Sequence, residues 1–431
     1  MVGDAYLEAL RNIYLLHARG IKPGLLRIIH LLDELDNPHL QYPSIVVGGS
    51  SGKGSTSSMI GSILREAGYK VGLFTKPHML RYTERFQVGG REISQGELVK
   101  AYEEVWEAKE SVESKGHYPT FFEFTVALAF QIFYKMGVEL AVMEVGLGGR
   151  LDAVNIANTT LSVITNIHRE HTHILGETLQ EIALEKGGII RKGKPVVSGA
   201  ESGAEKVIKN IAYILSAPYH PIHDVKLLSF YPSPKGQEIE LSLGESTWSF
   251  RLPLIGLHQI HNAKLALYAA KTFHSLPSHS IIRGLGKVYW PGRMEYLQKD
   301  GVPILLDCAK DPYSLALTLR SIPIYLDHNS VLTVVSISRD KDYKRMMSLL
   351  SKHSKYLFIT RHRVMGRATD PKTLASFSTI DFKILPSVED AISCALQYSK
   401  NFDNPLIFVT GSVFTVGEAI KYLRKEPSDP L

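Results

Sequence analysis

The stretch SIVVGGSSGKGSTSSM, residues 44–59, decides how this chain is expected to fold. A short apolar run leads into glycines and small hydroxyl residues around Lys53, and a helix is expected over 55–66. A strand, a glycine turn and a helix start would together aim backbone N–H groups and an ammonium at one anion. The stretch departs from the common G-x-x-x-x-G-K-[ST] form, since Val47 and Gly54 occupy two of its fixed positions. It predicts a phosphate-binding loop, and the alternative is a plain turn with a surface lysine.

Composition places the chain among soluble globular proteins. Its 431 residues exceed one ordinary core, so two or three domains are expected. We expect neither a signal peptide nor a membrane span, because no apolar run approaches roughly 18 to 20 residues. Two cysteines, Cys308 and Cys394, are too few for a disulfide framework, so the cytoplasm is expected. The net charge of +6 suits small anions, while the absence of basic runs argues against a nucleic-acid partner.

Two successive α/β patterns divide the chain. Apolar runs that alternate with helical patterns predict buried parallel strands at 45–47, 70–74, 139–145 and 161–167. A second series of such runs lies at 302–307, 331–337, 355–360 and 404–410. Between them, residues 226–253 alternate with period two and predict a small β excursion of the first domain. The Pro-Gly pair in YWPGRMEYL marks the boundary, so we expect domains at 1–295 and 296–431.

Acidic and histidine residues follow two of the predicted strands. Glu144 ends a strand, and a carboxylate there, across from a phosphate loop, suits Mg²⁺ shared with a nucleotide. The alternative is a capping carboxylate in a tight turn. His168, His171 and His173 lack the cysteines or helical spacing of a zinc site. They are interpreted as polar loop residues, with one histidine as a candidate magnesium or phosphate contact.

Lys186 lies in the apolar stretch LEKGGII, residues 184–190. A lysine in such a setting needs a partner or an altered charge state. The residues alone nevertheless favour the simpler interpretation, a lysine near a helix end whose ammonium reaches solvent.

Taken together, these motifs resemble the folylpolyglutamate synthase and dihydrofolate synthase family of the Mur ligase superfamily. The resemblance runs along nearly the whole chain in the family's order. Its segments are ARGIKPGLLRI, NPHLQYP, GGSSGKGST, GYKVGLFTKPHMLRYTERFQVGGREIS, EVGLGGRLDAVN, HTHILGETLQEIALEKGGII, GLHQIHNAKLAL, WPGRMEYL, LDCAKDP and VTGSVFTVGEA.

The resemblance implies a two-domain Mur-ligase-like α/β architecture, with an N-terminal P-loop ATPase domain and a C-terminal Rossmann-like domain. It also implies ATP-dependent amide bond formation, in which ATP phosphorylates a carboxylate and the amino group of L-glutamate attacks the acyl phosphate. The expected acceptors are dihydropteroate, folylglutamates or both, with ATP and Mg²⁺ as cofactors and a monomer as the working state. The alternatives are a ligase with a different carboxylate acceptor and a non-catalytic ATP-binding protein.

The resemblance further implies residue roles. The implied catalytic residues are Lys53, His171 and Lys186, and the last matches a lysine that is carbamylated in the family. Glu144, His171 and Ser55 are the implied metal ligands. Asp152 and Arg150 are the implied substrate contacts. The implied nucleotide contacts are Gly49, Ser50, Ser51, Gly52, Lys53, Gly54, Ser55, Thr56, Asn262, Arg293, Asp307 and Lys310.

Several residues depart from the resembled pattern, and they cluster on the nucleotide and metal side. Lys76 replaces the serine of T-S-P-H, which binds magnesium in the family, and an ammonium cannot ligate Mg²⁺. Lys76 is interpreted as offering its charge to the γ-phosphate, partly in place of one metal. CAKDP, with Lys310 and Asp311, replaces G-A-H-N-P, and Ser50 and Ser51 replace Thr and Asn. The cluster indicates a retuned site, and it also motivates the non-catalytic alternative.

Overall fold

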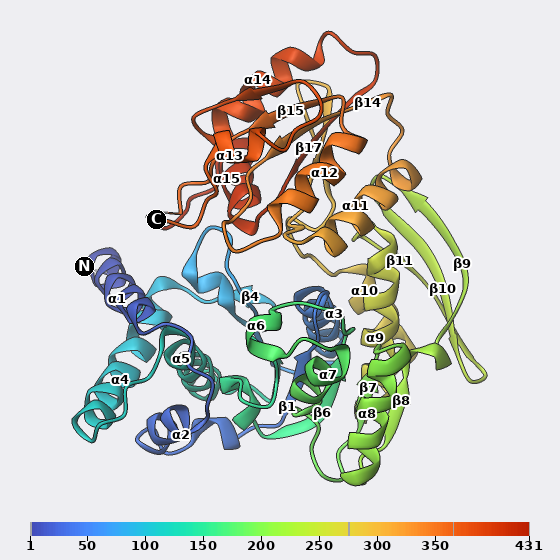
Figure 1. The fold of residues 1–431 in the computed structure, drawn as a ribbon. Helices are drawn as coiled ribbons and strands as arrows, with labels where there is room; N and C mark the ends of the chain where they lie inside the picture. The colour runs from blue at the N-terminus through green and yellow to red at the C-terminus, as the bar shows by residue number, and fades with distance from the viewer. Residues whose placement is uncertain (1, 275, 365, 431) are drawn as a thin grey trace.

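Two large, mainly parallel sheets form the body of the protein, and a small antiparallel sheet lies beside them (Figure 1). The computed structural model describes residues 2–274, 276–364 and 366–430. The first sheet has eight strands in the order β4-β3-β2-β5-β1-β6-β7-β8. Its strands are β1 (Ser44–Gly48), β2 (Val71–Phe74), β3 (Phe86–Val88), β4 (Arg91–Glu92), β5 (Leu140–Glu144), β6 (Thr159–Ile164), β7 (Val196–Ser198) and β8 (Tyr219–Pro221).

The C-terminal sheet has six strands in the order β12-β13-β17-β14-β15-β16, and β12 runs antiparallel to β13. Its strands are β12 (Glu295–Lys299), β13 (Val302–Leu306), β14 (Ser330–Val335), β15 (Tyr356–Ile359), β16 (Phe382–Ile384) and β17 (Pro405–Thr410). The antiparallel sheet, in the order β11-β10-β9, joins β9 (Lys226–Ser233), β10 (Gly236–Leu243) and β11 (Ser246–Leu252).

Helices cover both large sheets, and several begin at a side-chain cap. α4 begins after Ser94 and α5 after Thr120. In both caps the hydroxyl accepts the backbone N–H of the glutamate three residues later, and the carboxylate of that glutamate accepts the backbone N–H of the cap residue. The helices are α1 (Val2–Leu15), α2 (Leu26–Asp33), α3 (Lys53–Glu66), α4 (Gln95–Ser114), α5 (Phe121–Lys135), α6 (Thr172–Leu175), α7 (Leu179–Gly187), α8 (Ser202–Ile214), α9 (Leu257–His274), α10 (Ser278–Gly286), α11 (Pro312–Tyr325), α12 (Tyr343–His353), α13 (Pro371–Ala375), α14 (Val388–Ser399) and α15 (Val413–Arg424).

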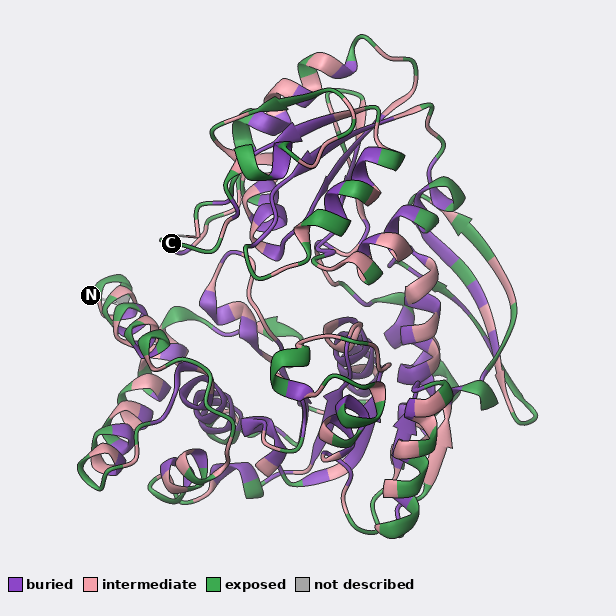
Figure 2. Cartoon of the chain, in the orientation of Figure 1, coloured by how far each residue is buried: buried purple, intermediate pink, exposed green. Residues whose placement is uncertain are grey.

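The central strands β1 and β5 are buried along their whole length, because helices cover both faces of the sheet (Figure 2). On one face, Val46 and Met143 belong to the same apolar cluster as Phe124 of α5. On the other face, Val142 shares a cluster with Ile60 of α3. Burial on both faces explains why these strands have continuous apolar sequences rather than alternating ones.

The secondary structure expected from the sequence is largely confirmed. The predicted runs of the first domain correspond to β1, β2, β5 and β6, and residues 226–253 form the antiparallel sheet. The helix expected from residue 55 begins earlier, at Lys53, because Gly52 adopts φ +81° and ends the loop. The C-terminal sheet begins at Glu295, and the division of the chain into domains at 295/296 stays a prediction. Within the described residues, no helix combines the length and apolar character that crossing a membrane requires.

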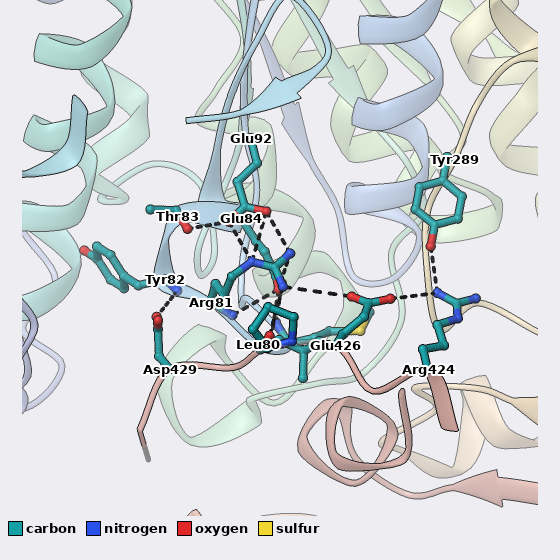
Figure 3. A network of polar contacts seen from close by, with 12 residues as sticks. Leu80, Arg81, Tyr82, Thr83, Glu84, Glu92, Tyr289, Arg424, Glu426 and Asp429 are labelled. Carbon is teal, nitrogen blue, oxygen red and sulfur yellow. Dashed lines mark hydrogen bonds and ion pairs between the residues drawn. The ribbon is translucent and has the colours of Figure 1, made fainter. Parts of the chain in front are cut away.

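The end of the described chain returns to its N-terminal part (Figure 3). The carboxylate of Asp429 is buried there and accepts hydrogen bonds from the Tyr6 hydroxyl at 2.8 Å and the Tyr82 backbone N–H at 2.7 Å. A guanidinium nitrogen of Arg81 lies 3.9 Å from Glu426 of the same tail. These contacts attach the C-terminal part of the molecule to the segment that follows β2.

Candidate active site

Two glycines with positive φ shape the loop between β1 and α3. Gly49 has φ +129° and Gly52 has φ +81°, which L side chains rarely adopt. A Cβ on Gly49 would lie 2.0 Å from Oγ1 of Thr165, and one on Gly52 would lie 2.4 Å from Oδ1 of Asn262. The glycines therefore let the loop pack directly against the end of β6 and against α9.

Lys53 begins α3 and folds back over this loop. Its ammonium donates to the carbonyl oxygen of Gly49 at 2.8 Å and to that of Ser50 at 3.0 Å. Phosphate oxygens would be stronger acceptors because they carry charge. The lysine is thus held where a phosphate group could replace its carbonyl partners.

The two serines of the loop attach it to the segment that follows β6. The backbone N–H groups of Ser50 and Ser51 donate to the backbone and side-chain oxygens of Asn166, each at 2.9 Å. Ser51 Oγ lies 2.8 Å from Nε2 of His168, and Ser50 Oγ accepts the His168 backbone N–H at 3.1 Å. The serines that depart from the resembled loop therefore contribute to its attachment.

Glu144 ends β5, the strand between β1 and β2, and its side chain is buried. Its Oε2 accepts the backbone N–H of Lys76 at 3.1 Å and lies 3.3 Å from the position of a Cβ on Gly54. A carboxylate against the loop, with the hydroxyl of Ser55 on α3, fits Mg²⁺, which usually combines one or two carboxylates with substrate phosphates. In the described chain, no three His, Cys, Asp or Glu side chains form a metal site on their own.

The ammonium of Lys76 donates to the carbonyl oxygen of Gly146 at 2.7 Å. Burial, with repulsion from the neighbouring Lys53, lowers the pKa of Lys76 to about 7. Glu144 and Asp152 oppose this shift, because their negative charges favour the ammonium form. A bound polyanion would favour that form further.

Lys186 on α7 is 1% exposed, so the interpretation as a solvent-reaching lysine is wrong. Its ammonium donates to Glu170 Oε1 at 2.7 Å and to the carbonyl oxygen of Gly49 at 2.9 Å. Burial lowers the pKa of Lys186 to about 8, although the Glu170 carboxylate acts against the shift. Burial alone would raise the pKa of Glu170, but Lys53 and Lys186 lower it to about 2. The ion pair supplies the partner that a buried lysine needs.

His171 lies directly before α6 with φ 47° and ψ 39°. Burial lowers the pKa of His171 to about 4, and the positive charges of Lys341, Lys310 and Lys76 act in the same direction. The imidazole is therefore neutral near pH 7, which is the form that ligates metals.

The opposite wall comes from the C-terminal sheet. Asp307 follows β13, is buried, and accepts hydrogen bonds from Met294 N at 3.0 Å, Ala309 N at 3.1 Å and Thr318 Oγ1 at 2.8 Å. Burial by itself would lower the pKa of Arg293, but its interactions with Cys308 and Asp307 help to raise that pKa overall. Asp307 thus fixes the connection between the two sheets at the edge of the cleft.

A cleft of about 410 Å³ lies between the phosphate loop and this wall. The carboxyl ends of β1 and β13 both open into it, which is where ligands bind in open α/β sheets. Glu144 lines it, while Gly49 and Thr56 stand outside its lining. The predicted nucleotide contacts that line it are Ser50, Ser51, Gly52, Lys53, Gly54, Ser55, Asn262, Arg293, Asp307 and Lys310.

Comparison with known proteins agrees with this geometry. Residues 47–270 match the family model of the Mur ligase middle domain. The dihydrofolate synthase/folylpolyglutamate synthase of Bacillus subtilis is 32% identical over 415 residues, covering 94% of this chain and 96% of that protein. The chain belongs to this ligase family. The folylpolyglutamate synthase of Lacticaseibacillus casei is 30% identical, covering 90% of this chain and 91% of that protein.

Solved structures of folylpolyglutamate synthases share the fold. The Mycobacterium tuberculosis enzyme complexed with ADP and AMPPCP has a TM-score of 0.91 at 28% identity, covering 98% of this chain and 100% of that chain. Escherichia coli FolC in complex with DHPP and ADP has a TM-score of 0.86 at 25% identity, covering 97% and 98%. The two-domain Mur-ligase-like α/β architecture expected from the sequence is confirmed.

In this folylpolyglutamate synthase family member, the two residues expected to bind substrate stand outside the cleft lining. Arg150 is exposed and pairs with Glu185 at 2.7 Å. Asp152 is buried, and its two oxygens accept the backbone N–H groups of Leu147 at 2.7 Å and Val154 at 3.0 Å. Asp152 thus closes the glycine turn, and a role for either residue in substrate binding stays a prediction.

Sequence reasoning missed two residues that support the phosphate loop of this family member. Glu170 neutralises Lys186, and the need of a buried lysine for a counter-charge was the available signal. Asn166 accepts hydrogen bonds from the backbone N–H groups of Ser50 and Ser51. Its position after a predicted strand was the only sequence signal for this role.

Proposed function

We propose that this ATP-dependent ligase joins L-glutamate to dihydropteroate, to folylglutamates, or to both. The observation that carries the proposal is the single cleft into which the phosphate loop, Glu144 and the Asp307 segment open. A cleft between two domains can hold a nucleotide and two further substrates, and its closure would exclude water from a reactive acyl phosphate. Membership of the family supplies the reaction class.

The residues divide the chemical work as follows. Lys53 and the N–H groups at the start of α3 bind the ATP phosphates. An acceptor carboxylate oxygen attacks the γ-phosphorus, and ADP leaves with the electrons of the broken P–O bond. The deprotonated glutamate amine then attacks the acyl carbon, phosphate departs with the electrons of the broken C–O bond, and the nitrogen loses a proton to water. When bound, Mg²⁺ would be held by Glu144 and Ser55 with phosphate oxygens, and it would neutralise phosphate charge. His171, which stands outside the cleft lining, is a proposed third ligand.

The remaining contacts are proposed from position. Asn262 touches the phosphate loop, while Arg293, Asp307 and Lys310 line the opposite wall, so these four residues are proposed nucleotide contacts. Lys186 supports the loop through Gly49 and is a proposed participant in catalysis. We further propose that the protein is cytoplasmic and works as a monomer. Size-exclusion chromatography with light scattering would test the oligomeric state.

The test is a coupling assay with two acceptors in parallel. Purified protein is incubated with ATP, Mg²⁺, L-glutamate and either dihydropteroate or a reduced folate. We expect glutamate-dependent phosphate release and a product heavier by one glutamate residue. Lys53→Met should abolish both signals, and Lys209→Met, an exposed lysine on α8, should leave them unchanged. Absence of glutamate-dependent release with both acceptors would contradict the proposal.

The same assay separates the alternatives. Product formed only with another carboxylic acid from a panel would indicate a different acceptor. ATP binding without turnover on any acid would indicate a non-catalytic protein. The arrangement of Lys53, Glu144 and Lys186 around one loop favours the catalytic alternative.

A further inference from the structure

Lys76 adds a positive charge to a site that already contains two cleft lysines. The strands β2, β5 and β1 are neighbours in the sheet, so Lys76, Glu144 and the phosphate loop follow one another along its carboxyl edge. Lys53 and Lys310 line the same cleft as Lys76. Three ammonium groups around one cleft indicate a ligand with several negative charges.

The side chain of Lys76 reaches across the end of β5. Its backbone N–H donates to Glu144 Oε2 at 3.1 Å, while its ammonium donates to the carbonyl oxygen of Gly146 at 2.7 Å. Within the described chain, this carbonyl is the only hydrogen-bond acceptor of the ammonium. An ammonium has three donors, so two N–H groups are left for a ligand.

The carbonyl that holds Lys76 belongs to the turn on the side where the acceptor is expected. A Cβ on Gly146 would lie 2.4 Å from Cζ of Phe122 and 2.9 Å from Oδ2 of Asp152. The ammonium therefore lies between the nucleotide cleft and the turn that Asp152 closes. A carboxylate bound beside this turn would therefore be close to the Lys76 ammonium.

We infer that Lys76 is a further catalytic residue, whose ammonium binds the acceptor carboxylate and the γ-phosphate as they meet. This inference rests on the proposed ligase function. The carboxylate and the γ-phosphate are both anionic, and a fixed cation between them stabilises their approach and the transferring phosphoryl group. Lys76 neither gains nor loses a proton in this step; the carboxylate forms the new O–P bond, and ADP leaves with the electrons of the old one.

The position of Lys76 also limits how many metal ions the site takes. The backbone N–H of Lys76 bonds Glu144, the carboxylate proposed to hold Mg²⁺, and the charges of the two side chains interact. The ammonium would therefore repel a second divalent cation there. Lys76 therefore takes the place of one metal ion, and a single divalent cation is expected with the nucleotide. A serine at this position would instead offer a hydroxyl oxygen, which is an Mg²⁺ ligand.

Three substitutions test the catalytic role. Lys76→Met should lower kcat for glutamate-dependent product formation by about 10²–10³-fold with KM for ATP little changed, because the lost contact acts mainly in the transition state. Lys76→Arg should recover at least about tenfold over Lys76→Met, because the charge is kept. Lys70→Met removes an exposed lysine beside the opposite end of β2 and should match the wild type. A kcat of Lys76→Met within about threefold of wild type would overturn the inference.

Counting the bound metal ions tests whether the Lys76 ammonium replaces one of them, and it needs no turnover. Mn²⁺ is titrated by electron paramagnetic resonance into protein saturated with a non-hydrolysable ATP analogue. We expect one bound Mn²⁺ for the wild type and two for Lys76→Ser. Two Mn²⁺ for both proteins, or one for both, would overturn the replacement of a metal by Lys76. This measurement involves no acceptor, so it is decided separately from the ligase assay, whose failure would contradict the proposed function instead.

Discussion

The Nζ atom of Lys186 and the Oε1 atom of Glu170 lie 2.7 Å apart, and the lysine also holds the carbonyl oxygen of Gly49. The side chain of Lys186 is 1% exposed and that of Glu170 is 20% exposed. An ion pair this deeply placed beneath the phosphate loop couples the stability of the protein to the shape of its nucleotide site.

Breaking this pair should destabilise the fold. Glu170→Gln leaves the charged Lys186 buried with a carbonyl as partner, and should lower the free energy of unfolding by about 2 kcal/mol in urea titrations. The control is Glu66→Gln, which breaks the pair of Glu66 with Lys287, whose side chain is 60% exposed, and should cost less than about 1 kcal/mol. Equal losses in the two variants would contradict the prediction. A double-mutant cycle with Lys186→Met measures the coupling directly.

Gly52→Ala should damage both the fold and nucleotide binding. Alanine at φ +81° costs about 1 kcal/mol for the backbone alone, and its Cβ would displace Asn262. We expect affinity for an ATP analogue to fall at least about tenfold in calorimetric titration. Gly68→Ala is the matched control, because Gly68 has φ +97° with no atom within 4 Å of its Cβ position. Gly68→Ala should lower the free energy of unfolding by a similar amount and leave nucleotide affinity unchanged. An equal loss of affinity in both variants would show that the contact of Gly52 with Asn262 is not the cause.

Asp429→Ala should loosen the attachment of the C-terminal tail. The substitution leaves the Tyr6 hydroxyl and the Tyr82 N–H without their acceptor, at a cost of about 2 kcal/mol in the free energy of unfolding. Asp429→Asn keeps one acceptor oxygen, so its free energy of unfolding should lie between those of the wild type and Asp429→Ala. Asp381→Ala, at an exposed carboxylate directly before β16, should change stability by less than about 0.5 kcal/mol. A wild-type urea midpoint for Asp429→Ala would show that the Asp429 contacts contribute nothing to stability.

The buried imidazole of His39 should make stability depend on pH. Burial lowers the pKa of His39 from 6.5 to about 4, and its Nδ1 has no partner among the described residues. Below pH 6.5 His39 binds a proton in the unfolded chain, whereas in the folded chain it stays neutral until about pH 4. Stability therefore falls as the pH drops from 6.5 to about 4. The full contribution is about 3 kcal/mol.

The measurement compares urea midpoints between pH 4.5 and 7.5 for the wild type and His39→Leu. The variant should show a shallower dependence on pH, because the titrating group has gone. His279→Gln, at an exposed histidine of α10, should keep the wild-type slope. A slope in His39→Leu as steep as that of the wild type would remove His39 as the cause.

The elements of this fold could be predicted because local sequence decides them. Strands such as β5 and β17 are buried on both faces, and a short continuous apolar run is typical of such strands. The phosphate loop could be located because glycines at 49 and 52 are needed for its backbone, whatever surrounds it.

The support of the site could not be predicted in the same way. Lys186 meets Glu170 and Gly49 only through tertiary packing, so its local apolar sequence suggested a different, solvent-reaching position. The attachment of Asp429 to Tyr6 joins segments at opposite ends of the chain, and neither segment carries a local signal for it. Lys76 was identified as unusual, but only the sheet order places it beside Glu144.

The contact of the phosphate loop with Asn262 has a practical consequence. Gly52 lies against a residue of α9, and Gly49 accepts from a lysine of α7, so the loop takes its shape only when distant segments have assembled. Retention on an ATP-analogue resin should therefore select completely folded molecules. Partly folded chains with native helix content should pass through the resin, even where circular dichroism does not distinguish them.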